Sequence, residues 1–274
     1  MRRALAGLAL ALAALAPAEA REITAEELAS LPPADVVIVG EVHDNPVHHV
    51  NQAKVIAAVR PRALVFEMLT DAQARRLRPE LVDNPELLDA VLGWSAAGWP
   101  DIRIYLPVFR AARGLPAFGG AVPREAARRA VREGAAAVLG DSAALFGLDE
   151  PLPPEEQSLR EAEQAEAHCN ALPEDLLPGM VAAQRLRDAA LARAVIAAMA
   201  ETGGPVVVIT GNGHTRRDRG VPLMLARAAP ELRVLSIGQL EAQPEEGETP
   251  PFDLWLVTPP HPRPDPCEEL RRRQ

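Results

Sequence analysis

The sequence predicts an α/β fold with a mainly parallel central sheet flanked by helices. Apolar runs at 36–39, 63–66 and 205–210 are each short and each end at glycine or a polar residue. Unbroken apolar runs of this length are typical of strands buried on both faces of a parallel sheet. Helical patterns separate these runs, and strands that alternate with helices indicate an α/β domain.

The first twenty residues are interpreted as a secretory signal peptide. Two arginines precede an apolar run from 4 to 15, which is too short to cross a bilayer, and Ala18-Glu19-Ala20 matches a small-x-small cleavage site. We therefore expect cleavage after Ala20, a periplasmic location, and no transmembrane segment in the mature chain. No lipobox cysteine lies near the cleavage site, so a lipid anchor is not expected.

Charge and cysteine content exclude some classes of function. The formal net charge of the 274-residue chain is −9, which disfavours binding to nucleic acid. Cys169 and Cys267 are the two cysteines, and neither lies in a CxxC or CxxCH motif, so neither a zinc ribbon nor a covalently attached haem is predicted. In an oxidising compartment the two thiols could pair, but spacing does not decide whether they meet.

The first strand leads into a polar turn and a capped helix. Glu41 and His43 follow the run at 36–39 directly. Asn45 is suited to cap a helix and Pro46 to its first position, so we expect a helix from 46 to 59. The unit is a strand, an acidic and imidazole-bearing turn, and a helix.

The remaining elements follow in order. Further strands are expected at 115–118, 231–237 and 252–257. Further helices are expected from Pro85, from 104 towards 113, and at 123–132, 155–169, 174–201 and 221–228. Because no clear strand pattern occurs at about 123–200, we interpret that stretch as a helical insertion within one domain of residues 21–274.

Polar groups stand at the ends of three predicted strands. They are Glu41 with His43, Glu67, and His214 after Gly211-Asn212-Gly213. In a parallel sheet the carboxyl ends of the strands meet at one edge, where ligands bind. Two carboxylates and two imidazoles in one cleft could hold a divalent metal or act as acid and base. Alternatively, each group hydrogen-bonds neighbouring backbone and has only a structural role.

Tyr105 is the single tyrosine of a chain with only 3% aromatic residues. Trp94, Trp99 and Phe109 lie near it in the sequence. A phenolate oxygen can ligate ferric haem, and aromatic walls suit a flat apolar ligand. Core packing with a hydrogen-bonded hydroxyl is the alternative interpretation, and composition alone favours it.

The other histidines have structural interpretations. His48 and His49 fall on the helix after the first strand and are expected to be partly exposed structural residues. His168 lies near a helix end, where an imidazolium would favour the helix dipole. His261 lies among prolines and is expected at the surface.

Several motifs together resemble the ChaN-like family of haem-binding lipoproteins. The order and spacing of the motifs carry the resemblance, which covers about 36–222. They are Gly40-Glu41-Val42-His43-Asp44-Asn45-Pro46 with His49 and Gln52, Phe66-Glu67-Met68, Gly98-Trp99-Pro100 with Tyr105 and Pro107, Met180 to Gln184 with Arg187-Asp188, and Gly211-Asn212-Gly213-His214. The family belongs to a wider group that includes erythromycin esterases and Tiki-type metalloproteases.

The resemblance implies a haem-binding protein of haem and iron uptake. In the family a tyrosine is the axial ligand of the iron, and two haems stack between two subunits, so a homodimer with haem at its interface is implied. The resemblance gives the ligand role to Tyr105. Contacts to the haem propionates are implied for His168, Lys54 or Arg187. The chain departs from the family in lacking the lipobox cysteine.

Two classes of function therefore remain open at this stage. The first is haem binding through Tyr105. The second is a hydrolase in which Glu41, His43, Glu67 and His214 activate water, with or without a metal. No GxSxG nucleophile elbow occurs, which disfavours an α/β-hydrolase mechanism. A scaffold that retains the polar cluster only for packing is the third alternative.

Overall fold

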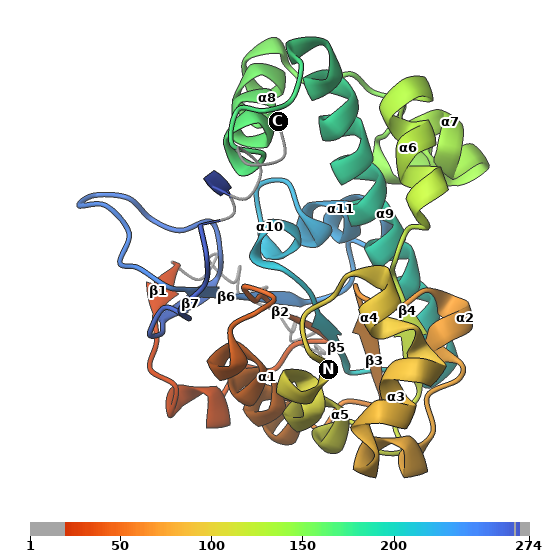
Figure 1. Cartoon of the computed structure of the whole chain (residues 1–274), viewed down its shortest axis with the longest axis vertical. Coiled ribbons are helices and arrows are strands. Elements are labelled where there is room, and N and C mark those ends of the chain that lie inside the picture. Colours follow the sequence, from red (N-terminus) through yellow and green to blue (C-terminus); the bar gives the residue numbers. More distant parts are fainter. Residues whose placement is uncertain (1–19, 266, 269–274) are drawn as a thin grey trace, which may run out of the picture.

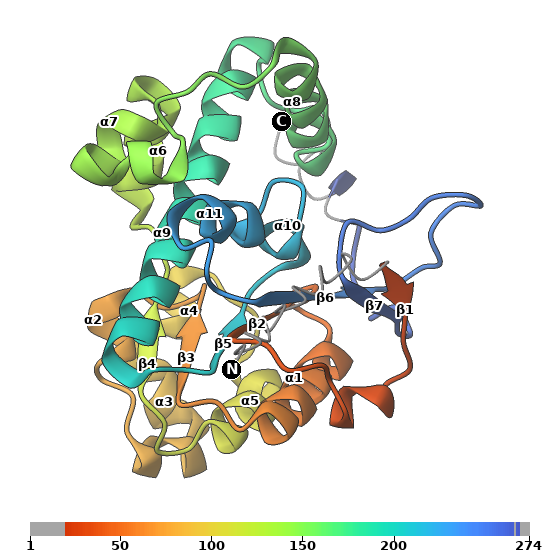
Figure 2. The same ribbon diagram turned by 180° about the vertical axis from the view of Figure 1, so that it is seen from behind.

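The computed structural model describes residues 20–265, 267 and 268. Seven strands form one sheet in the order β1-β7-β6-β2-β5-β3-β4, and every neighbouring pair is parallel. Helices cover both faces of the sheet, as Figures 1 and 2 show from opposite sides. The predicted α/β class with a parallel sheet is thus confirmed. The predicted signal peptide lies, apart from Ala20, outside the described residues.

The strands are short and the helices vary widely in length. The strands are β1 (Arg21–Glu22), β2 (Val36–Val39), β3 (Ala63–Phe66), β4 (Ala117–Gly119), β5 (Val206–Ile209), β6 (Val234–Leu240) and β7 (Leu254–Val257). The α-helices are α1 (Pro46–Val59), α2 (Asp71–Ala74), α3 (Pro85–Leu92), α4 (Trp94–Ala97), α5 (Leu106–Ala111), α6 (Arg124–Glu133), α7 (Ala135–Leu139), α8 (Pro154–Ala167), α9 (Leu177–Thr202), α10 (Asn212–Thr215) and α11 (Val221–Ala228). Within the described residues, no helix has the length and apolarity needed to cross a bilayer.

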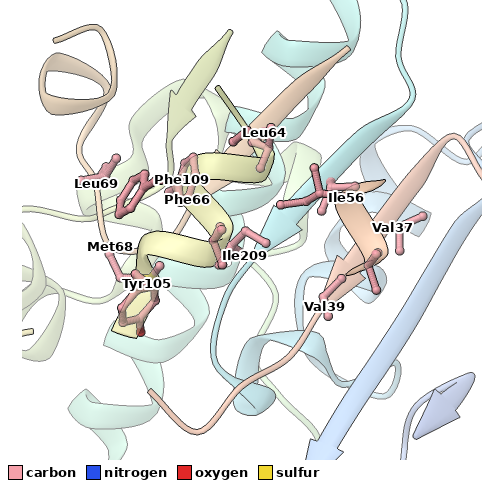
Figure 3. Close-up of a cluster of buried hydrophobic side chains, with 14 of the residues drawn as sticks. Val37, Val39, Ile56, Leu64, Phe66, Met68, Leu69, Tyr105, Phe109 and Ile209 are labelled. Carbon is pink, nitrogen blue, oxygen red and sulfur yellow. The ribbon is translucent and has the colours of Figure 1, made fainter. Parts of the chain in front are cut away.

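The central strands separate two hydrophobic cores. Successive side chains of a strand point to opposite faces of the sheet. Val37 and Val39 of β2 therefore join a cluster with α1 and α5, part of which Figure 3 shows. Val36 and Ile38 join a second cluster with α9 and α11. All four residues of β2, β3 and β5 are buried, as the unbroken apolar runs predicted.

Two predicted strands are displaced along the sequence. The strand expected at 231–237 is β6, which begins at Val234; Arg233, just before it, forms an ion pair with Asp35, 2.9 Å apart. It continues through Gly238, which lies under the ring of Phe252; a Cβ there would lie 2.4 Å from that ring. The strand expected at 115–118 is β4, at Ala117–Gly119. The two-residue strand β1 and the short helix α10 were not predicted.

All secondary-structure elements between residues 123 and 200 are helices. This region contains α6, α7, α8 and α9, and Figure 1 shows α6 and α7 beside α9 and away from the sheet. A disulfide joins Cys169, in the connection between α8 and α9, to Cys267 near the C-terminus. The thiols that the sequence left undecided are therefore paired.

Gly40, at the end of β2, permits a close approach between two loops at the carboxyl edge of the sheet. A Cβ at Gly40 would lie 2.2 Å from Asn212 Oδ1. The Asn212 side chain has little freedom to move, because it donates to the Gln239 carbonyl at 2.6 Å and accepts from the Gln239 amide at 3.0 Å.

We expect Gly40→Ala to lower the free energy of unfolding by about 1–3 kcal/mol, because the added methyl group overpacks this contact. Urea unfolding monitored by circular dichroism measures the loss. Val47→Ala, at a position 38% exposed on α1, is the control and should stay within about 0.5 kcal/mol of the wild type. An equally small effect of Gly40→Ala would show that Asn212 can move aside.

Candidate functional site

The three strands that end in polar groups are neighbours in the sheet. β5 pairs with β2 on one side and with β3 on the other, in parallel register, so Val39, Ile209 and Phe66 end at the same edge. Their following segments line one cleft of about 560 Å³. Glu41, His43, Glu67 and His214 are all part of its lining, as the sequence predicted. The parallel register of the strands is the physical reason for this convergence.

Glu41 and His43 form a hydrogen-bonded pair within one turn. His43 Nδ1 donates to Glu41 Oε1 at 2.6 Å. The other ring nitrogen, Nε2, lies 3.8 Å from Glu67, and the His43 side chain is 34% exposed. The ring of Trp99 stands edge-on to that of His43, with 5.0 Å between centroids. His43 thus presents one ring nitrogen to the cleft, and Glu41 orients the ring from behind.

The Glu41 carboxylate is fully buried and is surrounded by donors. The Tyr105 hydroxyl donates to Glu41 Oε1 at 2.5 Å, and Gln52 Nε2 donates to Oε2 at 2.6 Å. His49 Nδ1 lies 3.5 Å from Oε2. Burial by itself raises the pKa of Glu41, but hydrogen bonds and charge from His43 and His49 outweigh it and keep the pKa below its usual range. Glu41 is therefore an anion that water does not reach.

Glu67 and His214 form the second half of the site. Glu67 Oε2 accepts from the Thr210 hydroxyl and from the Gly211 amide, both at 2.7 Å. Glu67 Oε1 lies 3.4 Å from His214 Nε2, and Asp188 on α9 accepts from His214 Nδ1 at 2.6 Å. His214 is thus held between two carboxylates, and its side chain is only 7% exposed.

The charges of this network reinforce one another. Burial lowers the pKa of both histidines, but the neighbouring carboxylates reverse that effect and raise the pKa to about 9 for His43 and about 10 for His214. Burial raises the pKa of Glu67, but the two imidazoles bring it down to about 2. Burial also raises the pKa of Asp188, and there it outweighs the effect of His214. Two imidazolium groups between carboxylates are the expected state of the free site at neutral pH.

The geometry does not fit Tyr105 as an accessible iron ligand. Its side chain is completely buried, and its ring packs 3.7 Å from that of His49, measured between centroids. Figure 3 places it within the hydrophobic cluster, beside Met68. Burial, followed by the charge of Glu41, raises the pKa of the phenol far above its ordinary value. Tyr105 instead donates to Glu41, which is the core-packing alternative considered from the sequence.

The four strand-end residues do not form a divalent-metal site. Among residues 20–265, 267 and 268, no group of three or more His, Cys, Asp or Glu side chains has an arrangement that could hold a metal ion. Glu41 explains part of this, because its oxygens accept from His43, Tyr105 and Gln52 behind the cleft. The metal hypothesis drawn from the sequence is therefore not supported.

The three residues considered for propionate contacts are dispersed. Arg187 lines the cleft, and its side chain has no hydrogen bond or ion pair with any described residue. Lys54 is exposed on α1 and does not line the cleft. The His168 ring donates to the carbonyl of Gln164 in its own helix at 2.8 Å and is also absent from the lining. The cleft therefore offers Arg187 as its cation.

The sequence predicted that His48 and His49 are partly exposed. This prediction is wrong, because both residues are fully buried. Each ring has backbone and side-chain partners that make burial possible. His48 Nδ1 accepts from the Val42 amide at 2.8 Å, and its Nε2 lies 2.7 Å from the Thr258 hydroxyl. His49 Nε2 donates to the His43 carbonyl at 3.0 Å. Both histidines thus fix the turn that holds Glu41 and His43.

Other members of the site were not assigned a role from the sequence. Asp188 orients His214, Gln184 Nε2 lies 3.2 Å from His214 Nδ1, and Gln52 donates to Glu41. Gln52, Gln184 and Asp188 do lie in the motifs of the family resemblance. Their positions in the motifs were the only available signal. These residues lie on helices, so the pattern of polar residues at the ends of the strands did not apply to them.

The sequence matches the profile of a known family. The family is described as haem-binding uptake, Tiki superfamily, ChaN, and the match spans residues 28–225. The chain belongs to this family. The matched residues include Glu41, His43, Glu67 and His214. No curated protein matches the chain significantly.

One solved structure agrees with this assignment at the level of the fold. ChaN of Campylobacter jejuni, described with cofacial haem binding, has a TM-score of 0.57 and 17% identity, over 82% of this chain and 88% of that one. The type III effector HopBA1 is less similar, with a TM-score of 0.44 and 16% identity over 82% of this chain and 88% of that one. At such identities the likeness to ChaN shows a shared fold.

His48 gives the turn of the site a specific pH dependence. Burial, followed by the charge of His49, lowers the pKa of His48 to about 4. The fold therefore favours neutral His48, so its contribution to stability is complete above the unfolded-state pKa of about 6.5 and is lost as pH falls towards 4.

We expect the free energy of unfolding to fall between pH 6.5 and 5 in the wild type, with a slope of up to about 1.4 kcal/mol per pH unit from His48. His48→Gln should flatten this slope, because the unfolded chain then has no imidazole at position 48 to bind a proton. Urea unfolding at a series of pH values measures it. Equal slopes in the two proteins would contradict the assigned burial of a neutral His48.

Proposed function

We propose that this protein binds haem in the cleft at the strand ends. Membership of a haem-binding family is the main support. The cleft volume of about 560 Å³ lies within the ordinary range of small-molecule and cofactor sites. The cleft has an aromatic wall at Trp99 and an unpaired cation, Arg187, in the same lining as the His43 imidazole. These groups suit a flat ligand with acidic substituents.

The observation that carries the proposal is the geometry of His43. A histidine that ligates a metal usually donates its other ring nitrogen to a carboxylate or carbonyl, which fixes the ring. His43 has this arrangement. Its Nδ1 donates to Glu41, and its Nε2, on the other side of the ring, lies 3.8 Å from Glu67 in the cleft. Imidazole is a common axial ligand of haem iron. We therefore assign the ligand role to His43, and a propionate contact to Arg187.

Tyr105 enters this proposal as a positioning residue. To reach an iron atom it would have to leave the hydrophobic cluster and give up its bond to Glu41. His214 is a poorer candidate than His43, because its side chain is only 7% exposed against 34% for His43, and its Nε2 lies closer to Glu67, at 3.4 Å rather than 3.8 Å. When bound, haem would supply ferric iron to the His43 nitrogen, which would give up its proton to solvent, and the chain would supply orientation and charge.

We further propose that the protein acts in haem or iron uptake outside the cytoplasm. The signal-peptide pattern at the N-terminus supports export, and the Cys169–Cys267 disulfide is typical of proteins in oxidising compartments. The homodimer with haem at its interface, implied by the resemblance, remains a prediction.

Titration with hemin, followed by the Soret absorbance, tests the ligand. His43→Ala should weaken binding at least about tenfold and shift the Soret band, because the iron loses its ligand. Tyr105→Phe should keep the wild-type spectrum. The opposite pattern, with the spectrum lost only in Tyr105→Phe, would return the ligand role to the tyrosine. Light scattering on the same samples reports whether haem brings two copies together.

A second candidate function is an acid/base hydrolase. Two carboxylate–imidazole pairs, Glu41 with His43 and Asp188 with His214, approach Glu67 from two sides. A single haem ligand does not need a second pair of this kind. Imidazolium groups oriented by carboxylates can give a proton to a leaving group, and a carboxylate beside them can take a proton from water. Glu67 lies between the two imidazoles and could act as that base.

A panel of ester and amide substrates tests this candidate. If wild-type protein turns any of them over, Glu67→Gln and Asp188→Asn should each reduce the rate by about 10²–10⁴-fold, because a positioned acid or base is lost. Glu166→Gln, which alters an exposed carboxylate on α8 that does not line the cleft, is the control and should retain the rate. Absence of wild-type turnover on the whole panel removes the hydrolase candidate and leaves haem binding untouched.

A further inference from the structure

A second hollow lies beside the strand-end cleft, between α6 and α9. It encloses about 310 Å³, and Figures 1 and 2 both show the two helices packed side by side. Its apolar lining includes Val122, Val131 and Met180. Its charged lining consists of arginines 124, 128 and 187, without any Asp or Glu. We call this hollow the arginine groove.

The arginine groove meets the cleft at Arg187, which lines both hollows. The N-terminus of α6 also approaches the segment that provides the aromatic wall. Arg124 Nη2 donates to the Ala97 carbonyl at 3.0 Å, two residues before Trp99. A ligand that lies against His43 and Trp99 can therefore extend into the groove without leaving the surface of one chain.

The cations of the groove have fewer partners than other arginines nearby. Both acidic residues of α6 are used elsewhere, Glu125 by Arg132 at 3.6 Å and Glu133 by Arg129 at 2.9 Å. Within the described chain, neither Arg128 nor Arg187 has an ion pair or a side-chain hydrogen bond. In a chain with a net charge of −9, three arginines around one hollow without a carboxylate form a local positive field.

The placement of these arginines opposes the stability of α6. Arg124 is the first residue of the helix, where the macrodipole is positive and a cation is unfavourable. Arg124 and Arg128 are four residues apart, so they lie on one face and repel each other. A bound anion would relieve both repulsions, and it would gain from the helix N-terminus as well.

We propose that the arginine groove is the subsite for the carboxylate groups of the ligand. The ligand class is a planar, largely apolar body with an acidic edge, and the two carboxylates of haem fit that description. This inference rests on the proposed haem binding and adds that Arg128 and Arg124, together with Arg187, receive the propionates. The porphyrin body would then lie across the cleft, towards Trp99 and His43.

Binding of three probes separates the subsite from the iron ligand. The probes are hemin, hemin dimethyl ester and metal-free protoporphyrin IX, and quenching of tryptophan fluorescence gives the dissociation constants. Arg128→Ala should weaken hemin and protoporphyrin binding about fivefold, as expected for one exposed charge pair, and should leave the ester unchanged. Added salt should weaken wild-type hemin binding more than Arg128→Ala binding, because salt screens the lost interaction.

Arg129→Ala is the matched control, because Arg129 is the next residue on α6, is also exposed, and does not line the groove. It should bind all three probes as the wild type does. If wild-type protein binds hemin and its ester equally well and Arg128→Ala changes neither, the subsite is wrong while haem binding stands. If wild-type protein binds neither hemin nor protoporphyrin, both the proposed function and the subsite are overturned.

Discussion

The buried carboxylate of Glu41 is the group on which the arrangement of the site depends. An unpaired charge removed from water costs several kcal/mol, so such a group must collect donors. Glu41 collects them from three elements: His43 from the same turn, Gln52 from α1, and Tyr105 from the 3₁₀ turn Ile102–Tyr105. Each of these contacts fixes its element to the end of β2. The turn, the helix and the aromatic segment are therefore ordered together.

This constraint divides the site into a buried part and an accessible part. Glu41 and Tyr105 are withdrawn from solvent, and His43 is the hydrogen-bond partner of Glu41 whose side chain is partly exposed in the cleft. The same division recurs around His214, whose orienting partner Asp188 is buried on α9. Buried carboxylates thus orient two imidazoles, and the ligand role that we propose for His43 rests on this orientation.

Several features of the site followed from local patterns in the sequence. The strands 36–39 and 63–66 have the same bounds as the apolar runs that predicted them. The helix after β2 begins at Pro46, and Asn45 accepts from the Val47 amide at 3.0 Å. The shared edge for Glu41, Glu67 and His214 followed from the parallel sheet. The burial of Tyr105 could not be predicted from local patterns. A tyrosine among aromatic neighbours has the same sequence pattern whether it is buried or exposed.

What the sequence alone determined is the three central strands, the helix that follows the first of them, and the polar residues at their ends. Apolar runs and helix caps act over a few residues, so a local pattern contains them. The tertiary structure decided the partners: Tyr105 meets Glu41 across 64 residues, and His214 meets Asp188 across 26. These contacts depend on how α9 and the aromatic segment pack against the sheet, and no local pattern encodes that packing.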